Sequence, residues 1–187
     1  MRSSNNRGRQ RRETMMSNPF PMIKAILSTT AARWLNLTET IPVDVLTHSP
    51  APNEWSALEW LGHLLATEKW VFPVRVRALL AGQPIPAFDP DAQGMKITSL
   101  TPEQLAVEFA RLRRTSLEEL ERVAVSDLTR STHHSELGMV TLGELLHEWV
   151  AHDLMHTVQA ERALMQPFIR ESGPWRSYFR DHDVGSQ

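Results

Sequence analysis

The chain has 187 residues, 41% of them hydrophobic, which is enough to bury the core of one globular domain. It contains no cysteine, so disulfide bonds, thiolate metal ligands and a cysteine nucleophile are excluded. The net charge of −2 is unevenly distributed, because residues 1–18 hold five arginines and one glutamate and leave 15 basic against 21 acidic residues in the rest. An acidic body argues against binding to nucleic-acid phosphates as the main function.

Residues 1–18 are basic and lack an apolar stretch, so they fit neither a secretory signal nor a twin-arginine signal. We predict a disordered tail here and one domain over residues 19–183. A transit peptide or a nucleic-acid-binding arm is the alternative for the tail, and a start at Met15 or Met16 would remove most of it. Since no apolar run reaches about 18 residues, we expect no membrane-spanning helix, no membrane partner and a cytoplasmic location.

The first half of the chain predicts two long helices, because apolar residues recur there at three- and four-residue spacing. The first helix covers residues 21–39, and a loop follows over residues 46–53. The second covers residues 54–81, with Asn53 as its N-cap. Pro73 lies inside this span and should kink the helix or divide it into two pieces.

The third helix is predicted over residues 102–123, after a long loop that is rich in proline and glycine over residues 83–100. Thr101 is its expected N-cap, and a proline at the first helical position fits a helix start. Residues 127–140 are predicted to be irregular. No segment of the sequence shows a convincing strand pattern.

The fourth helix is predicted over residues 142–165, ending before Pro167. Thr141 and Glu144 fit a capping box at its start. The aromatic C-terminal stretch, residues 168–183, should pack back on the helices. Four long helices and no strands predict an all-α fold, a four-helix bundle.

Histidines are concentrated in the fourth helix. The stretch beginning His147-Glu148 is not the H-E-x-x-H metalloprotease signature, because one residue too many precedes His152. His152 and His156 are four residues apart on the inward line of this helix, and they can point toward one ion. A structural pair, joined by hydrogen bonds or partly hydrated, is the alternative. A third ligand is expected from His63 in the apolar second helix, although a lone core histidine also fits that position.

Two sequence elements together resemble the DinB-like superfamily. One reads Trp-Ser-x-x-Glu-x-x-x-His-Leu in the second helix, and the other reads His-Asp-x-x-His-x-x-Gln in the fourth. The matching residues here are Trp55, Ser56, Glu59, His63 and Leu64, then His152, Asp153, His156 and Gln159. The resemblance covers roughly residues 23–164, and the later stretch GPWRSYF is also similar.

This resemblance implies a four-helix bundle with a long crossover loop and a divalent metal, zinc, nickel or iron, on His63, His152 and His156. Some members of the family are thiol-S-transferases that use bacillithiol, mycothiol or glutathione, and others are proposed metal-dependent hydrolases. The family name refers to DNA damage induction and does not imply DNA binding.

Three further polar residues are candidates for a catalytic role. Glu59 and Glu148 each precede a candidate ligand by four residues and could act as a general base or support a ligand, or be ordinary surface acids. Gln159 could hydrogen-bond a ligand imidazole or bound water, or pack at the core edge. Asp153 should point away from the ion. Four of the other histidines are expected to lie on the opposite face of the helix or in exposed loops: His147, His133, His134 and His182.

Three functions remain open on the sequence. The first is an enzyme that uses the metal to activate a low-molecular-weight thiol cosubstrate, and the absence of cysteine is consistent with it. The second is metal-assisted hydrolysis by bound water. The third is a metal-binding or stress-response bundle without turnover. In each case the expected partner is a small molecule and not a nucleic acid, and a homodimer is left open.

Overall fold

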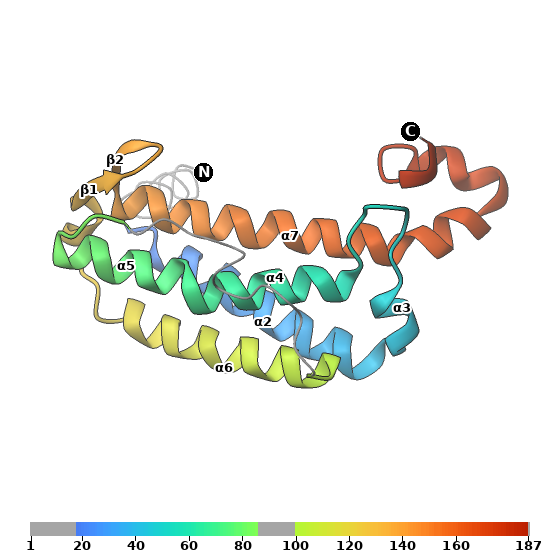
Figure 1. Cartoon of the computed structure of the whole chain (residues 1–187), viewed down its shortest axis with the longest axis horizontal. Helices are drawn as coiled ribbons and strands as arrows, with labels where there is room; N and C mark the ends of the chain where they lie inside the picture. The colour runs from blue at the N-terminus through green and yellow to red at the C-terminus, as the bar shows by residue number, and fades with distance from the viewer. Residues whose placement is uncertain (1–17, 86–99, 187) are drawn as a thin grey trace, which may run out of the picture.

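A computed structural model describes residues 18–85 and 100–186, and it confirms the predicted all-α four-helix bundle (Figure 1). The predicted tail and most of the predicted loop over residues 83–100 lie outside the described residues. The long helices that form the bundle are α2 (Phe20–Thr40), α4 (Ala57–Trp70) continued by α5 (Phe72–Ala81), α6 (Pro102–Leu120) and α7 (Leu142–Glu171). None of the helices within the described ranges is both long and apolar enough to cross a membrane.

The direction of the helices explains the long connection before α6. In Figure 1, α4 and α5 run from right to left, and α6 runs in the same direction. Two neighbouring parallel helices cannot be joined by a short turn, so a long connection between α5 and α6 is required. This arrangement agrees with the expected crossover between the second and third predicted helices.

The second predicted helix is divided in two and begins later than predicted. Ser56, not Asn53, is the N-cap of α4, and its hydroxyl accepts from the backbone N–H of Glu59 in a capping box. Asn53 instead has a positive φ of 65° and lies in the preceding turn. The helix breaks at Val71, as expected two residues before Pro73, which lies in the first turn of α5.

Two segments that were predicted to be irregular contain regular structure. A short helix, α3 (Val43–Thr47), extends into the first two residues of the predicted 46–53 loop. The strands β1 (Ser131–His134) and β2 (Gly138–Thr141) form an antiparallel hairpin after a 3₁₀ turn, so the prediction of no strand was wrong. Four-residue strands are too short to show a clear alternation of apolar residues. His134 was predicted to be exposed in a loop, but it is only 8% exposed, and its ring Nδ1 accepts from the backbone N–H of Glu136.

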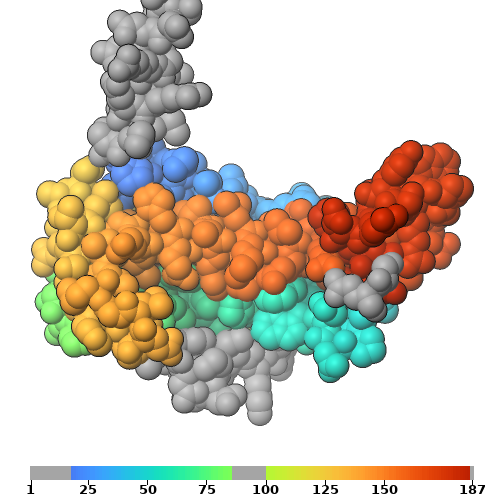
Figure 2. Space-filling view, turned by 90° about the horizontal axis from the view of Figure 1, so that it is seen from above, coloured from blue at the N-terminus to red at the C-terminus, as the bar shows by residue number. Residues whose placement is uncertain are grey.

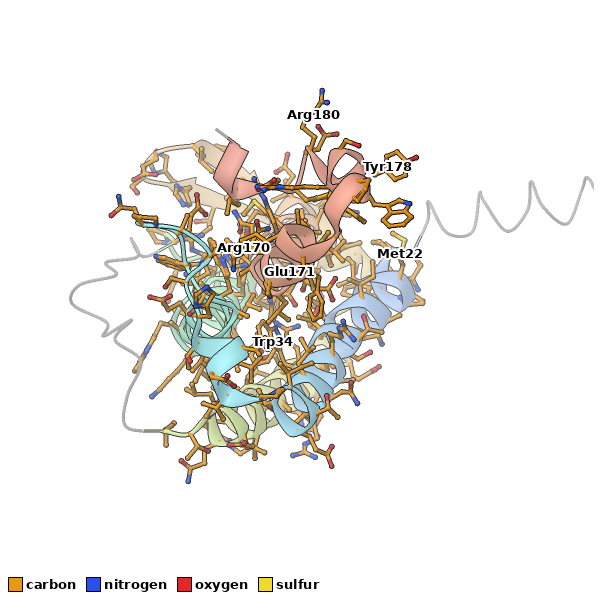
Figure 3. The ribbon with its side chains drawn as sticks, turned by 90° about the vertical axis from the view of Figure 1, so that its right-hand side faces the viewer. Met22, Trp34, Arg170, Glu171, Tyr178 and Arg180 are labelled. Carbon is orange, nitrogen blue, oxygen red and sulfur yellow. The ribbon has the colours of Figure 1, made fainter. Side chains whose placement is uncertain are left out.

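Helix α7 continues through Pro167 to Glu171, about two turns of chain beyond the predicted stop. Gln166 is buried and donates to the carbonyl of His182, which ties the end of α7 to the C-terminal segment, residues 172–186. This segment folds beside the end of α7, but its aromatic side chains do not pack on the bundle as predicted. Tyr178 is 80% exposed and points away from the helices, whereas Trp34 lies in their interior (Figure 3).

The core consists of two apolar clusters separated by a polar layer. One cluster lies at the hairpin end and includes Leu27, Phe72 and Trp149, and the other lies at the far end and includes Phe109 and Ala160. Buried polar residues occupy the positions between the clusters on three helices: Glu68 on α4, Arg113 on α6, and Asp153 and His156 on α7.

Candidate metal centre

The structure brings together the three histidines predicted to bind metal. His63 lies on α4, and His152 and His156 lie one turn apart on the facing side of α7. Their closest ring nitrogens all lie within 4.8 Å of one another. Two parts of the chain almost ninety residues apart therefore meet at one point, because α4 packs against α7 along this level of the bundle.

The donor geometry fits a shared cation. The Nε2 atoms of His63 and His152 are 3.1 Å apart. Two imidazole nitrogens bound to one zinc ion at about 2.0–2.1 Å are themselves roughly 3 Å apart. A direct hydrogen bond between the two rings would explain this pair alone, but it would give no role to the ring of His156 beside them. One cation can accept all three nitrogens.

Hydrogen bonding fixes which nitrogen of His156 faces the site. Its Nδ1–H donates to the side-chain Oε1 of Gln159, one turn further along α7. The lone pair is therefore on Nε2, the form of imidazole that binds a metal. The Nδ1 atoms of His63 and His152 are buried and have no hydrogen-bond partner among the described residues. Their rings are consequently held by packing and not by a carboxylate.

The site keeps its imidazoles neutral. Burial, together with the neighbouring His156, lowers the pKa of His63 from 6.5 to about 4. Burial also lowers the pKa of His152 to about 3, with smaller effects from the other two rings and from Arg113 and Arg75. Burial lowers the pKa of His156 as well, against the raising effect of its bond to Gln159. At neutral pH no proton competes with a cation for these nitrogens.

Aromatic rings surround the histidines, a feature that the sequence did not predict. Trp60 stacks on the ring of His156 with centroids 4.8 Å apart, and Trp55 contacts Trp60 at 4.5 Å. On the other side, Phe72 lies edge-on to His152 at 5.0 Å. Trp55 is partly exposed, so these rings form the boundary between the histidines and solvent. An apolar boundary lowers the local dielectric constant and strengthens electrostatic interactions at the site.

An ionic network lies directly behind the histidines and was also missed. Arg113 is 1% exposed, and its guanidinium donates to Asp153 at 2.6 Å and to Glu68 at 2.9 Å. It also donates to the backbone carbonyl of Leu27 at 2.8 Å, and Ser116 donates to Glu68. The network therefore links α2, α4, α6 and α7. It confirms that Asp153 points away from the three imidazole nitrogens.

The remaining candidate residues have different surroundings. The Oε2 atom of Glu59 accepts from both the N–H and the hydroxyl of Ser56 at 2.7 Å, so its carboxylate is held in the helix cap. The side chain of Glu148 is exposed overall. The surrounding protein still partly desolvates its carboxyl group and so raises its pKa, and the nearby positive charge of Arg75 opposes this rise. His147 is exposed and its ring bonds to the carbonyl of Gly143, away from the site.

Comparison with known proteins gives both a sequence family and similar folds. Residues 26–160 match the sequence model of the DinB superfamily. No curated protein matches significantly. The solved structure of YfiT from Bacillus subtilis, described as "a probable metal-dependent hydrolase with an unusual four-helix bundle topology", is 17% identical with a TM-score of 0.66, over 80% of this chain and 87% of YfiT. The DinB-like protein YjoA from Bacillus subtilis is 20% identical with a TM-score of 0.55, over 78% of this chain and 91% of YjoA.

Proposed function

The chain belongs to the DinB superfamily, and from that premise we propose that it is a metal-dependent enzyme that holds a divalent cation on His63, His152 and His156. The convergence of these three neutral imidazoles is the observation that carries the proposal. A cation bound this way polarises a coordinated group and makes a bound thiol or water more acidic. With three protein ligands, one coordination position stays available to a substrate or cosubstrate.

The residues around the histidines prepare the site for such a group. Gln159 orients the ring of His156, and Phe72 and Trp60 hold two imidazoles by ring contacts. The three ligands are neutral, so the full charge of the cation acts on the group in the open position. The tryptophan boundary excludes water from one side and offers a planar apolar surface to a small-molecule substrate.

Transfer to a low-molecular-weight thiol is the reaction that the site favours. A thiol has a pKa near 8.5 and needs little help to become a thiolate. A strong general base is therefore unnecessary, which suits a site in which the Glu59 carboxylate is occupied by Ser56. The chain has no cysteine, so the sulfur nucleophile would come from a cosubstrate such as bacillithiol, mycothiol or glutathione.

Metal-assisted hydrolysis is the second candidate, and Glu148 favours it. Its carboxyl group lies one turn before His152 on α7, and its raised pKa brings it closer to the range of a general acid or base. The words used for YfiT also point to hydrolysis, although the two chains share only 17% of their residues. In this reaction Glu148 would take a proton from the attacking water.

The experiment compares metal-loaded protein with metal-free protein on two substrate panels. Thiol transfer predicts metal-dependent consumption of an electrophile only when one of the three thiols is present. Hydrolysis predicts metal-dependent cleavage of esters or amides without a thiol. His156→Ala should abolish either activity, and His147→Ala, an exposed histidine on the same helix, should not. Tight metal binding with neither activity would refute the enzyme and leave a metal-binding bundle.

A further inference from the structure

Arg75 on α5 lies beside the candidate metal centre. It comes three residues, about one helical turn, after Phe72, whose ring lies edge-on to the ring of His152. Helix α5 packs against α7, and Figure 2 shows the green and teal segment that contains α4 and α5 along one side of α7, in orange. Burial is the main cause of the lowered pKa of His152, and the positive charge of Arg75 adds to it, so Arg75 is close enough to act on this histidine.

The guanidinium of Arg75 has no close acidic partner. Its side chain is partly buried, and within residues 18–85 and 100–186 it forms no hydrogen bond and no ion pair. Burial lowers its pKa, and two carboxyl groups oppose this effect from a distance, Glu148 on α7 and Glu136 in the turn between β1 and β2. Arg77 on the same helix differs, because it donates to both carboxylate oxygens of Glu119. The N–H donors of Arg75 are therefore available to a bound anion.

The surroundings of the three histidines differ on the two sides. Glu148 lies four residues before His152, so the two side chains project from the same edge of α7, and the charge of Arg75 acts on both. On the other side, Trp60 stacks on the ring of His156. A small molecule at the metal can therefore place an apolar part against the tryptophan and a charged part toward Arg75.

The charges at the centre favour a negatively charged ligand. The three imidazoles are neutral, so a dication bound to them would keep its full charge. The carboxylates of Asp153 and Glu68 lie behind the histidines, and both are bonded to Arg113. An anion that binds Arg75 would therefore also be attracted by the charge of the metal.

We propose that Arg75 binds a carboxylate of the small molecule whose reacting group occupies the open metal position. The inference rests on the metal centre of the proposed function, and it assigns carboxylate-bearing substrates or cosubstrates to that centre. A planar guanidinium matches a carboxylate through two parallel hydrogen bonds. Among the thiols considered above, glutathione and bacillithiol carry carboxylates, whereas mycothiol does not.

The test compares two thiols that differ in the charge of one end, 4-mercaptobutyrate and 4-mercaptobutanamide, as ligands of the cobalt-loaded protein. Cobalt(II) bound by a thiolate gives an absorption band, so binding is measured without turnover. The wild type should bind the carboxylate about ten-fold or more tightly than the amide, as expected for a hydrogen bond between charged groups. Arg75→Met should remove this preference and leave the affinity for the amide similar. Arg75→Lys should keep part of it, because lysine keeps the charge without the planar fork.

Arg77→Met is the matched control and should keep the full preference, because Arg77 is exposed and paired with Glu119. Equal binding of the two thiols by the wild type would overturn the assignment of Arg75 and leave the metal centre intact. A preference that persists in Arg75→Met would overturn it as well, because the carboxylate would then contact the metal or another residue. A wild type that binds no cobalt, or whose spectrum neither thiol changes, would refute the open metal centre and the role of Arg75 with it.

Discussion

Replacing Arg113 with methionine should destabilise the protein strongly, because it removes the cation shared by two buried carboxylates. The guanidinium contacts Glu68 and Asp153 at hydrogen-bonding distance, and all three side chains are at most 2% exposed. Methionine keeps much of the volume and none of the charge. Both carboxylates would then have to be buried without a partner or take up a proton.

The expected loss is about 3–5 kcal/mol at neutral pH, the range for breaking a buried ion pair from one side. For a domain of this size the loss corresponds to a decrease in Tm of roughly 6–20 °C. Since a domain is stable by only about 5–15 kcal/mol, a large part of the folding free energy would be lost. The variant should nevertheless fold at low temperature.

The loss should also depend on pH. Burial already raises the pKa of Glu68, and Arg113 is the main group that opposes this rise. Without Arg113 the pKa of Glu68 in the folded protein rises further above its pKa in the unfolded chain. The ionised carboxylate therefore destabilises the folded state at high pH. This destabilisation decreases as the pH falls through the folded-state pKa, because the carboxyl then takes up a proton. The difference between wild type and variant should therefore shrink between about pH 7 and about pH 5, by up to about 1.4 kcal/mol per pH unit for Glu68.

Urea unfolding followed by circular dichroism measures this difference at each pH. Arg77→Met is the matched control, because Arg77 pairs with Glu119 at 2.9 Å on the surface, where such a pair contributes at most about 1 kcal/mol. A loss for Arg113→Met as small as that of the control, or a difference that grows as the pH falls, would refute the reasoning.

Four predictions concern the metal centre. His156→Ala should lower zinc affinity by more than about 100-fold, yet unfold cooperatively, because most residues of the two apolar clusters do not contact the histidines. An unfolded variant would mean that the ring of His156 is needed for folding. Gln159→Leu should lower the affinity by about 10–100-fold in the same titration by losing the bond that orients His156, and an unchanged affinity would exclude that role. With the pKa of His63 at about 4 and that of His152 at about 3, affinity should fall less than about ten-fold from pH 7.5 to 5.5, whereas three imidazoles of ordinary pKa would lose about 1,000-fold. Over the same range the metal-free protein should lose stability, because the unfolded chain takes up protons near pH 6.5 that the folded site does not.

The helices and the pair of neighbouring histidines on α7 could be predicted because their signals are local. Thr101 and Thr141 are both N-caps as predicted, and Thr141 forms the predicted capping box with Glu144; Thr101 forms one as well, with Gln104. His152 and His156 follow from four-residue spacing on an inward face. The prediction that His63 joins these two histidines rested on the family resemblance, because a single histidine in an apolar helix does not indicate which residues it contacts.

The missed features depend on contacts between distant parts of the chain. Glu68, Arg113 and Asp153 each look like ordinary surface charges on their own helices, and only tertiary packing shows that they meet. Gln166, beside Pro167 in α7, similarly contacts a distant residue, because its side chain donates to the carbonyl of His182 in the C-terminal segment. Local rules that end helices near proline cannot anticipate such an anchor.

X-ray absorption spectroscopy of the zinc-loaded protein tests the central claim most directly, because it counts the imidazoles bound to the ion. We expect one zinc per chain, with scattering from three imidazoles and at least one further light atom at about 2.0–2.1 Å. Fewer than three imidazoles, or a first shell filled entirely by protein side chains, would contradict the open three-histidine centre.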